Sequence, residues 1–257
     1  MKKAIIIAAI VTAVAVICTV LSLRGWPGSL VGSGNLETEE YAFTDFSRIE
    51  ISSAFEFEIE QSSSYSINIT ADDNVMEYIR VSKDGQTLKI GLRTGLRIGS
   101  ITLSIGPGIF PIPGSVTLRA SVTMPQLNGL TVSGASRGTV SGFSSTEDLD
   151  ITVSGASSVT GDIIAGNVDF GISGASTIQL GGSANDIDAN VSGASRLNLD
   201  DFTVNNADVN FSGASSGTVN LSGRLDANLS GASTLWYIGE PTSTDINTSG
   251  ASTVSKK

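Results

Sequence analysis

The chain has 257 residues, a formal net charge of −10 and one cysteine, and more than 200 residues follow an apolar N-terminal segment. A single cysteine excludes an internal disulfide, but a domain of this length buries a sufficient core without one. The whole net charge lies in residues 131–250, which carry 13 acidic and 3 basic side chains. Phosphate binding requires Lys or Arg patches that this acidic region lacks, so nucleic acid is excluded as a partner.

Residues 1–24 are predicted to be a transmembrane helix that acts as a signal anchor. Residues 4–23 carry no charge and reach the roughly 20 residues that span a bilayer, whereas the apolar core of a cleaved signal peptide is usually shorter. Two lysines precede this run and favour a cytoplasmic N-terminus. We therefore expect a single-pass protein of the cell membrane, with a linker at 25–35 and an exported domain at 36–257.

Residues 46–92 are predicted to form the first, irregular turns of an all-β domain. In residues 55–60 aromatic or aliphatic side chains alternate strictly with glutamates, as in a strand with one buried face. Two interpretations of the three glutamates are open, a cation site and a solvated strand face, and the second is the commoner arrangement.

Residues 91–115 interrupt the pattern and are predicted to be an inserted hairpin. They hold three of the six prolines, together with Ile105, Ile109, Phe110 and Ile112. Exposed apolar patches often mark an interaction surface, so one hypothesis is that this segment touches the membrane or a partner. The alternative is that it folds over the first turn and covers the open end of the domain.

Residues 127–254 contain a repeat whose most regular part is the phrase Ser-Gly-Ala-Ser. The phrase begins seven times at intervals of 18 to 21 residues, at Ser133, Ser154, Ser173, Ser192, Ser212, Ser230 and Ser249. Before each copy apolar residues alternate with polar ones, which is typical of a strand with one buried face. The polar positions include six aspartates, Asp150, Asp169, Asp188, Asp208, Asp226 and Asp245.

This period predicts a parallel β-helix, or β-solenoid, with turns of about 19 residues. A unit of that size cannot bury a core alone and does so by stacking on its neighbours. Equivalent residues of successive turns then lie about 4.8 Å apart. We expect the Gly of each phrase to permit a tight corner and the Ala to fit beneath it.

The six stacked aspartates are the candidate metal site. Carboxylates at this spacing repel by roughly 1 kcal/mol per neighbouring pair before screening, and a divalent cation such as Ca²⁺ would relieve the repulsion. The alternative is that each aspartate is a solvated residue beside a turn, since no known calcium motif is present in the sequence. Calcium is therefore one hypothesis, and no other cofactor is expected.

An enzyme is not expected, and no catalytic residue is assigned. Polysaccharide-active β-helices need carboxylates of different pKa that converge on one site, usually beside Arg, Lys or His. The chain has no histidine, and its aspartates are equivalent by repetition. These features favour a binding or structural protein.

Two aromatic residues, Trp236 and Tyr237, fall in the last full turn. They are expected to cover the end of the core or to contribute to an interaction surface. Covered ends keep a solenoid monomeric, whereas open ends favour association of one solenoid with the next.

Several motifs resemble one known family in the same order along the chain. They are Gly32-Ser-Gly-Asn, the strand pair from Phe46 to Gln61, Asp84-Gly-Gln-Thr-Leu-Lys-Ile, Val122-Thr-Met-Pro-Gln-Leu and Leu-Thr-Val-Ser-Gly-Ala-Ser. Together they resemble the head GIN domain family of auto-transporter adhesins, over about 32–254. The resemblance implies a right-handed β-helix on the outside of a bacterial or archaeal membrane. Residues 91–115 are a departure, because the family usually has a shorter segment there.

Two non-enzymatic functions follow from these observations. The first is a membrane-anchored surface module that presents the long face of the solenoid to a glycan, a protein or a neighbouring cell. The second is a structural component of the envelope whose solenoids associate end to end. A cation-binding solenoid and a polysaccharide-active enzyme are further, weaker hypotheses.

Overall fold

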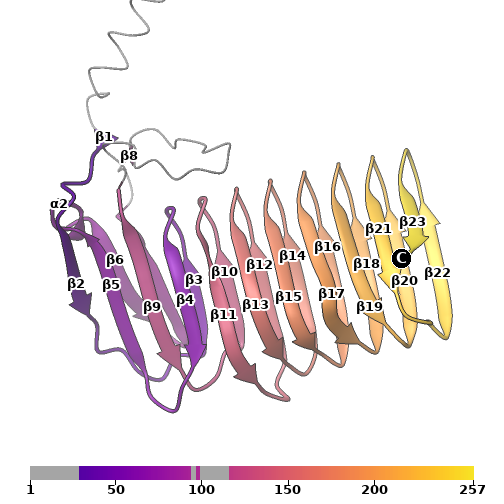
Figure 1. Cartoon of the computed structure of the whole chain (residues 1–257), viewed down its shortest axis with the longest axis horizontal. Coiled ribbons are helices and arrows are strands. Elements are labelled where there is room, and N and C mark those ends of the chain that lie inside the picture. Colours follow the sequence, from indigo (N-terminus) through magenta and orange to yellow (C-terminus); the bar gives the residue numbers. More distant parts are fainter. Residues whose placement is uncertain (1–28, 94–96, 99–115) are drawn as a thin grey trace, which may run out of the picture.

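The computed structural model describes residues 29–93, 97–98 and 116–257. These residues form a flattened β-solenoid of two sheets that face each other across one core (Figure 1). The prediction of an all-β solenoid with turns of about 19 residues is confirmed. Each regular turn contributes one strand to each sheet, and successive turns pair in parallel along the long axis.

The first sheet has ten strands. In spatial order they are β22 (Ser243–Thr248), β20 (Arg224–Leu229), β18 (Asn206–Phe211), β16 (Asp186–Val191), β14 (Val168–Ile172), β12 (Leu149–Val153), β10 (Gly129–Val132), β3 (Arg48–Ile51), β7 (Thr87–Leu92) and β6 (Ile79–Asp84). Only β6 runs antiparallel to its neighbour. We call this the Asp sheet, because its outer face carries the six repeated aspartates.

The second sheet has eleven strands. In spatial order they are β2 (Leu36–Glu40), β5 (Ser66–Asp72), β9 (Leu118–Met124), β4 (Glu56–Gln61), β11 (Arg137–Ser144), β13 (Ser158–Ile164), β15 (Thr177–Ser183), β17 (Arg196–Val204), β19 (Ser216–Leu221), β21 (Thr234–Ile238) and β23 (Thr253–Lys256). We call it the Thr sheet, because its outer face is rich in threonine. Strand β5 runs antiparallel to both of its neighbours, β2 and β9, and the other pairings of this sheet are parallel.

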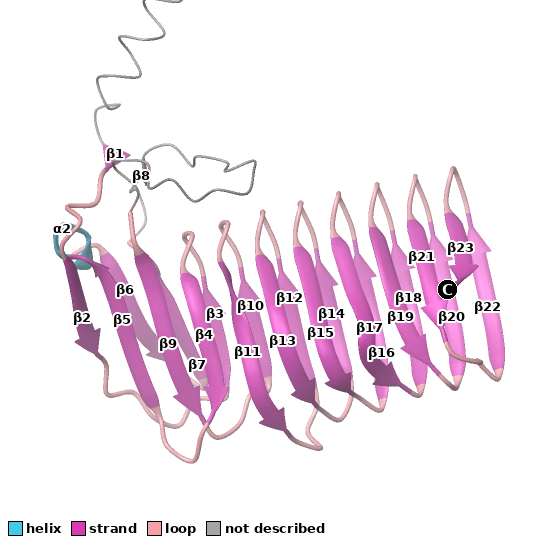
Figure 2. Ribbon diagram, viewed as in Figure 1, coloured by secondary structure: helices cyan, strands magenta, loops and turns pink. Residues whose placement is uncertain are grey.

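Alternation of buried and exposed residues explains why these segments form strands. In β16, for example, Ile187, Ala189 and Val191 are buried, whereas Asp188 and Asn190 are exposed. Figure 2 shows the strands of the two sheets as two layers. The inward residues of both layers meet in a single hydrophobic cluster whose buried members run from Phe46 to Leu235. Stacking therefore supplies the core that one turn lacks.

The Ser-Gly-Ala-Ser phrases form one edge of the solenoid, where each chain turn passes from the Asp sheet to the Thr sheet. The glycines have positive φ, and a Cβ on Gly213 would lie 2.7 Å from the carbonyl oxygen of Gly193 in the turn below. Only glycine fits this corner without strain. The prediction for Gly is confirmed.

The prediction for Ala was wrong. In the regular turns the Ala of the phrase is exposed, and the second Ser points into the core, as at Ala214 and Ser215. The Ser215 hydroxyl hydrogen-bonds to the carbonyl oxygen of Ser212 at 2.9 Å and lies 3.2 Å from the Ser233 hydroxyl of the next turn. The Ser hydroxyl can be buried because the backbone of the corner supplies a carbonyl oxygen that accepts its hydrogen bond. The Ala methyl group has no hydrogen bond to satisfy and lies on the outside of the corner.

The N-terminal turns are not stacked in chain order. Strands β3 and β4 lie between the turn made by β7 and β9 and the turn made by β10 and β11. A four-residue helix, α2 (Asp73–Met76), connects β5 to β6 at the end of the solenoid. This explains why residues 46–92 look irregular in the sequence, since the chain there builds a cap as well as two turns.

The first two residues of the predicted insertion at 91–115 belong to the end of β7 (Thr87–Leu92). The rest falls between β7 and β9, at the corner that Ser-Gly-Ala-Ser occupies in the regular turns. Its strand β8 (Arg97–Ile98) pairs in parallel with β1 (Ser29–Leu30). Ile105, Ile109, Phe110 and Ile112 lie outside the described residues.

At the other end, β22 and β23 form a last turn beyond Trp236 and Tyr237. Trp236 lies on the outer face of the Thr sheet and is 40% exposed, so it does not cover the end of the core. Tyr237 is half-buried and packs against the core. Every residue of β22 is exposed, including Ile246.

No helix among the described residues is long and apolar enough to span a bilayer. The predicted anchor at 4–23 lies outside those residues.

Candidate functional site

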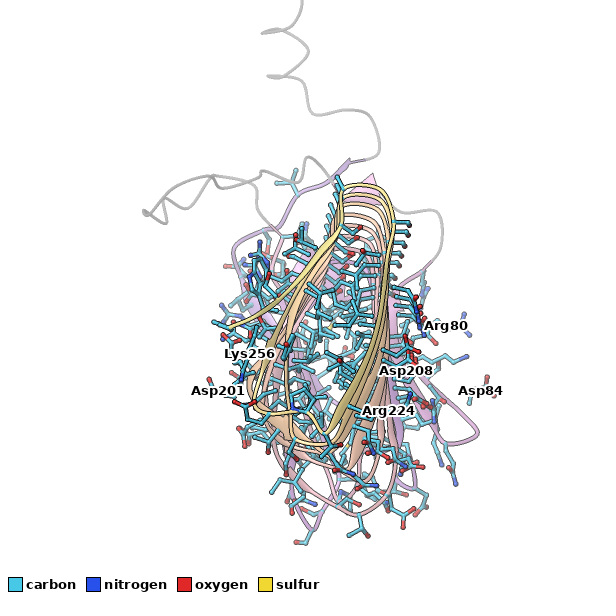
Figure 3. All side chains as sticks on the ribbon, turned by 90° about the vertical axis from the view of Figure 1, so that its right-hand side faces the viewer. Arg80, Asp84, Asp201, Asp208, Arg224 and Lys256 are labelled. Carbon is cyan, nitrogen blue, oxygen red and sulfur yellow. The ribbon has the colours of Figure 1, made fainter. Side chains whose placement is uncertain are left out.

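The six repeated aspartates form one column on the outer face of the Asp sheet. The strand register places each aspartate directly beside the aspartate of the next turn, in the order Asp150, Asp169, Asp188, Asp208, Asp226 and Asp245. The predicted stacking is confirmed. Figure 3, which looks along the solenoid, shows Asp208 on this face and Asp201 on the opposite one.

A second column runs parallel to the first, two residues later in each strand. It begins with Thr131, Thr152 and Gly171 and continues as asparagine in the last four turns. These asparagines and the serines two residues after them line a hollow of about 540 Å³, which we call the Asn groove: Asn190, Asn210, Asn228, Asn247, Ser192, Ser212, Ser230 and Ser249. The groove thus offers amide and hydroxyl groups at strand spacing.

Arginines lie beside two members of the Asp column. Arg48 Nη2 contacts Asp150 Oδ2 at 2.5 Å, although β10 lies between their strands. The contact passes over Gly129, where a Cβ would come within 2.6 Å of Arg48 Cζ. Arg224 Nη1 contacts Asp226 Oδ2 of its own strand at 2.9 Å.

The sequence reasoning missed Arg48. A signal was present, because the first Ser-Gly-Ala-Ser copy has Gly129 at the position where the later copies have aspartate. A glycine in an otherwise acidic column leaves room for a long side chain from the strand below. Since β3 comes 80 residues earlier, no local pattern connects Arg48 with that space.

The middle of the column has no such partners. Among the described residues, Asp169, Asp188 and Asp208 make no ion pair. Partial burial raises the pKa of Asp188, and the charges of Asp208 and Asp169 raise it further. The Asn190 amide, which donates to Asp188 Oδ1 at 2.9 Å, acts in the opposite direction. The middle of the face is therefore a strip of unrelieved negative charge.

The column does not resemble a chelating site. Within the described residues, no group of three or more His, Cys, Asp or Glu side chains is arranged to hold a metal ion. One carboxylate per strand produces a line, whereas Ca²⁺ prefers six to eight converging oxygens. Calcium binding stays a prediction.

The tandem aspartates Asp200 and Asp201 lie on the Thr sheet, away from the Asp column. Asp200 Oδ2 accepts a hydrogen bond from Lys257 Nζ at 2.7 Å, while its Oδ1 is buried without a partner among the described residues. Asp201 is exposed. One ion-paired and one solvated carboxylate do not form the acid and base pair that glycoside hydrolysis requires.

The family described as "Putative auto-transporter adhesin, head GIN domain" matches residues 45–241. The chain belongs to the head GIN domain family. The resemblance noted in the sequence is thereby confirmed, and it covers the two turns at the cap as well as the regular repeat.

Solved structures of bacterial proteins share the fold of this head GIN domain. A "putative adhesin" from Bacteroides fragilis superimposes with a TM-score of 0.74 at 20% identity, covering 88% of this chain and 98% of that one. A "putative lipid binding protein" from Parabacteroides distasonis superimposes with a TM-score of 0.66 at 21% identity over the same shares. A "putative adhesin" from Parabacteroides merdae superimposes with a TM-score of 0.60 at 18% identity, covering 88% of this chain and 98% of that one. No curated protein matches the chain.

Proposed function

We propose that this head GIN domain is a non-enzymatic binding module that is exported, anchored to the membrane through residues 4–23 and used in adhesion to surface glycans or proteins. The family description and the names of the two neighbours called adhesins support this function. None of the names reported above is that of an enzyme.

The observation that carries the proposal is the Asn groove. Its donors and acceptors repeat from turn to turn, so a linear ligand can make the same contact several times. Asn190 is held toward Asp188 by its amide, and Asn247 donates to Asn228 of the turn below at 3.3 Å. These bonds restrict the amide rotamers, which lowers the entropy cost of binding.

An adhesion assay tests the proposal. Beads carrying the full chain are counted on bacterial or host cells, beside beads carrying the double substitution Asn210→Ala/Asn228→Ala. Loss of two repeated contacts should reduce retained beads by at least about tenfold. Thr177→Ala/Gln179→Ala, on the outer face of the Thr sheet, is the matched control. Equal retention of the groove variant and the original chain would refute the role of this face.

A second function, end-to-end association, is supported by the two ends of the solenoid. The outer edges of β22 and β23 pair with no strand among the described residues, and neither do the outer edges of β6 and β2. The two ends of the Thr sheet carry opposite charges, three glutamates in β2 against Lys256 in β23. In the Asp sheet, β6 carries Arg80, Lys83 and Asp84, and β22 carries Asp245. Figure 3 shows Arg80 and Lys256 on opposite faces.

Sedimentation velocity of the full chain in detergent distinguishes the two functions. Head-to-tail association predicts oligomers that grow with concentration, shrink at high salt and are lost in Lys83→Glu. Arg196→Glu, on β17 in the interior of the Thr sheet, is the control. A monomer at all concentrations leaves the binding module as the function.

A further inference from the structure

We propose that the Thr sheet carries a second, separate binding site, for the carboxylate of a uronic acid residue in an acidic oligosaccharide. The site is a hollow of about 600 Å³ over β5, β9, β4, β11 and β13. We call it the Arg hollow, after Arg119 and Arg137, which line it with Glu56 and Glu58. It lies on the sheet opposite the Asn groove, so the two sites are independent.

The register of strands β9, β4 and β11 determines which charged side chains lie side by side in the Arg hollow. Arg119, Glu56 and Arg137 occupy one outward column on the adjacent strands β9, β4 and β11. Ser121, Glu58 and Thr139 form the next column, two residues later. Two guanidinium groups therefore flank one carboxylate on the same face.

The two arginines are not equally engaged. Arg119 Nε donates to Glu56 Oε2 at 3.2 Å. Arg137 is exposed, and among the described residues no carboxylate lies within ion-pair distance of it. It is also one of only three basic residues in the acidic stretch 131–250. Because a guanidinium binds a planar carboxylate with two parallel hydrogen bonds, Arg137 is the group that an incoming carboxylate would meet.

The rest of the hollow suits a saccharide. Between the long side chains the lining is short, and it combines the small Ala120 and Gly138 with the polar Asn68, Thr70, Thr139, Ser158 and Thr160. These polar groups both donate and accept hydrogen bonds, as sugar hydroxyls do. Glu58 adds an acceptor for hydroxyl donors, and together with Glu56 it disfavours a group of higher negative charge such as phosphate.

Calorimetric titration of the full chain with trigalacturonate tests the proposal. We expect saturable binding, and we expect fully methyl-esterified trigalacturonate, which has the same hydroxyls without the charge, to bind at least about tenfold more weakly. Arg137→Gln should lower trigalacturonate affinity by about tenfold or more. Arg196→Gln, in the same column three strands along the sheet, should leave it unchanged.

Four outcomes would overturn the proposal: no saturable binding, equal affinity for the ester, equal loss in Arg137→Gln and Arg196→Gln, or full competition by acetate at matched carboxylate concentration. Circular dichroism of each variant excludes unfolding as the cause of a loss. Asn210→Ala/Asn228→Ala should bind trigalacturonate normally, so failure of the Asn groove and failure of the Arg hollow can be told apart.

Discussion

The carboxylate of Asp72 accepts the backbone N–H of Thr117 at 2.7 Å. Its other oxygen accepts the backbone N–H of Gly34, also at 2.7 Å. Asp72 is 1% exposed, at the junction of β5 and α2. One buried side chain thus joins the segment that enters the domain to the segment that returns from the insertion between β7 and β9. The cap depends on this carboxylate, because it accepts the hydrogen bonds of two backbone N–H groups.

Asp72→Ala is predicted to destabilise the domain by about 2–4 kcal/mol, because it leaves two partly buried N–H groups without acceptors. Guanidinium denaturation of the full chain, followed by circular dichroism, measures the change. Asp84→Ala removes an ion pair with Lys89 in which the Asp84 side chain is 78% exposed, and should cost about 0–1 kcal/mol. Similar midpoints for the two variants would contradict the structural role of Asp72.

Gly213→Ala is predicted to destabilise by about 1–3 kcal/mol. The substituted residue would keep a φ of 78° and would push its Cβ toward the Gly193 carbonyl. Ala214→Ser, one residue later and exposed, should change stability by less than about 0.5 kcal/mol. Denaturation midpoints of the two variants check the prediction, and a neutral Gly213→Ala would show that the corner relaxes freely.

Gly129→Ala is predicted to break the contact between Arg48 and Asp150, at a cost of about 0.5–1 kcal/mol for an exposed pair. Gly171→Ala, on the same face, is the control. Its Cβ would lie 3.5 Å from Thr152 Oγ1, an ordinary contact, so this variant should be neutral or slightly stabilised. A double-mutant cycle measures the coupling: Arg48→Ala should add almost nothing to Gly129→Ala. Full additivity would mean that the arginine does not act across the glycine.

Asp188 makes stability depend on pH. Its pKa in the folded chain is raised above the ordinary 3.8, which means that folding disfavours the ionised carboxylate. This cost in stability is present at pH values above the folded pKa, and it disappears as the pH falls through that pKa. Asp188→Asn should therefore stabilise the domain at pH 7, by about 0.5 kcal/mol after solvent screening. This gain in stability should vanish at about pH 3 and shrink in about 1 M salt.

Denaturation midpoints at the two pH values measure this change. Ala214→Ser, which is exposed and changes no titratable group, is the control that should show no such dependence. A gain that persists at low pH would assign the effect to packing instead of charge.

Periodicity alone predicts the regular part of the fold. Alternation such as Ile187, Asp188 and Ala189 defines the strands, and the constant interval places the aspartates in one column. Features made by distant segments stay hidden, since neither Arg48 over Gly129 nor the placing of Arg119 and Arg137 on either side of Glu56 follows from local sequence. At the corner, Ala and Ser are both small, and the backbone carbonyl that accepts the Ser hydroxyl decides which one is buried.

The central claim is that the stacked face of the Asp sheet binds a linear ligand. The most direct measurement is binding of the full chain to an array of bacterial and host surface glycans, before and after Asn210→Ala/Asn228→Ala. The account predicts at least one glycan whose binding strengthens with chain length and falls by about tenfold or more in this variant, with Thr177→Ala/Gln179→Ala unchanged. Glycan binding that is identical in all three proteins would contradict it.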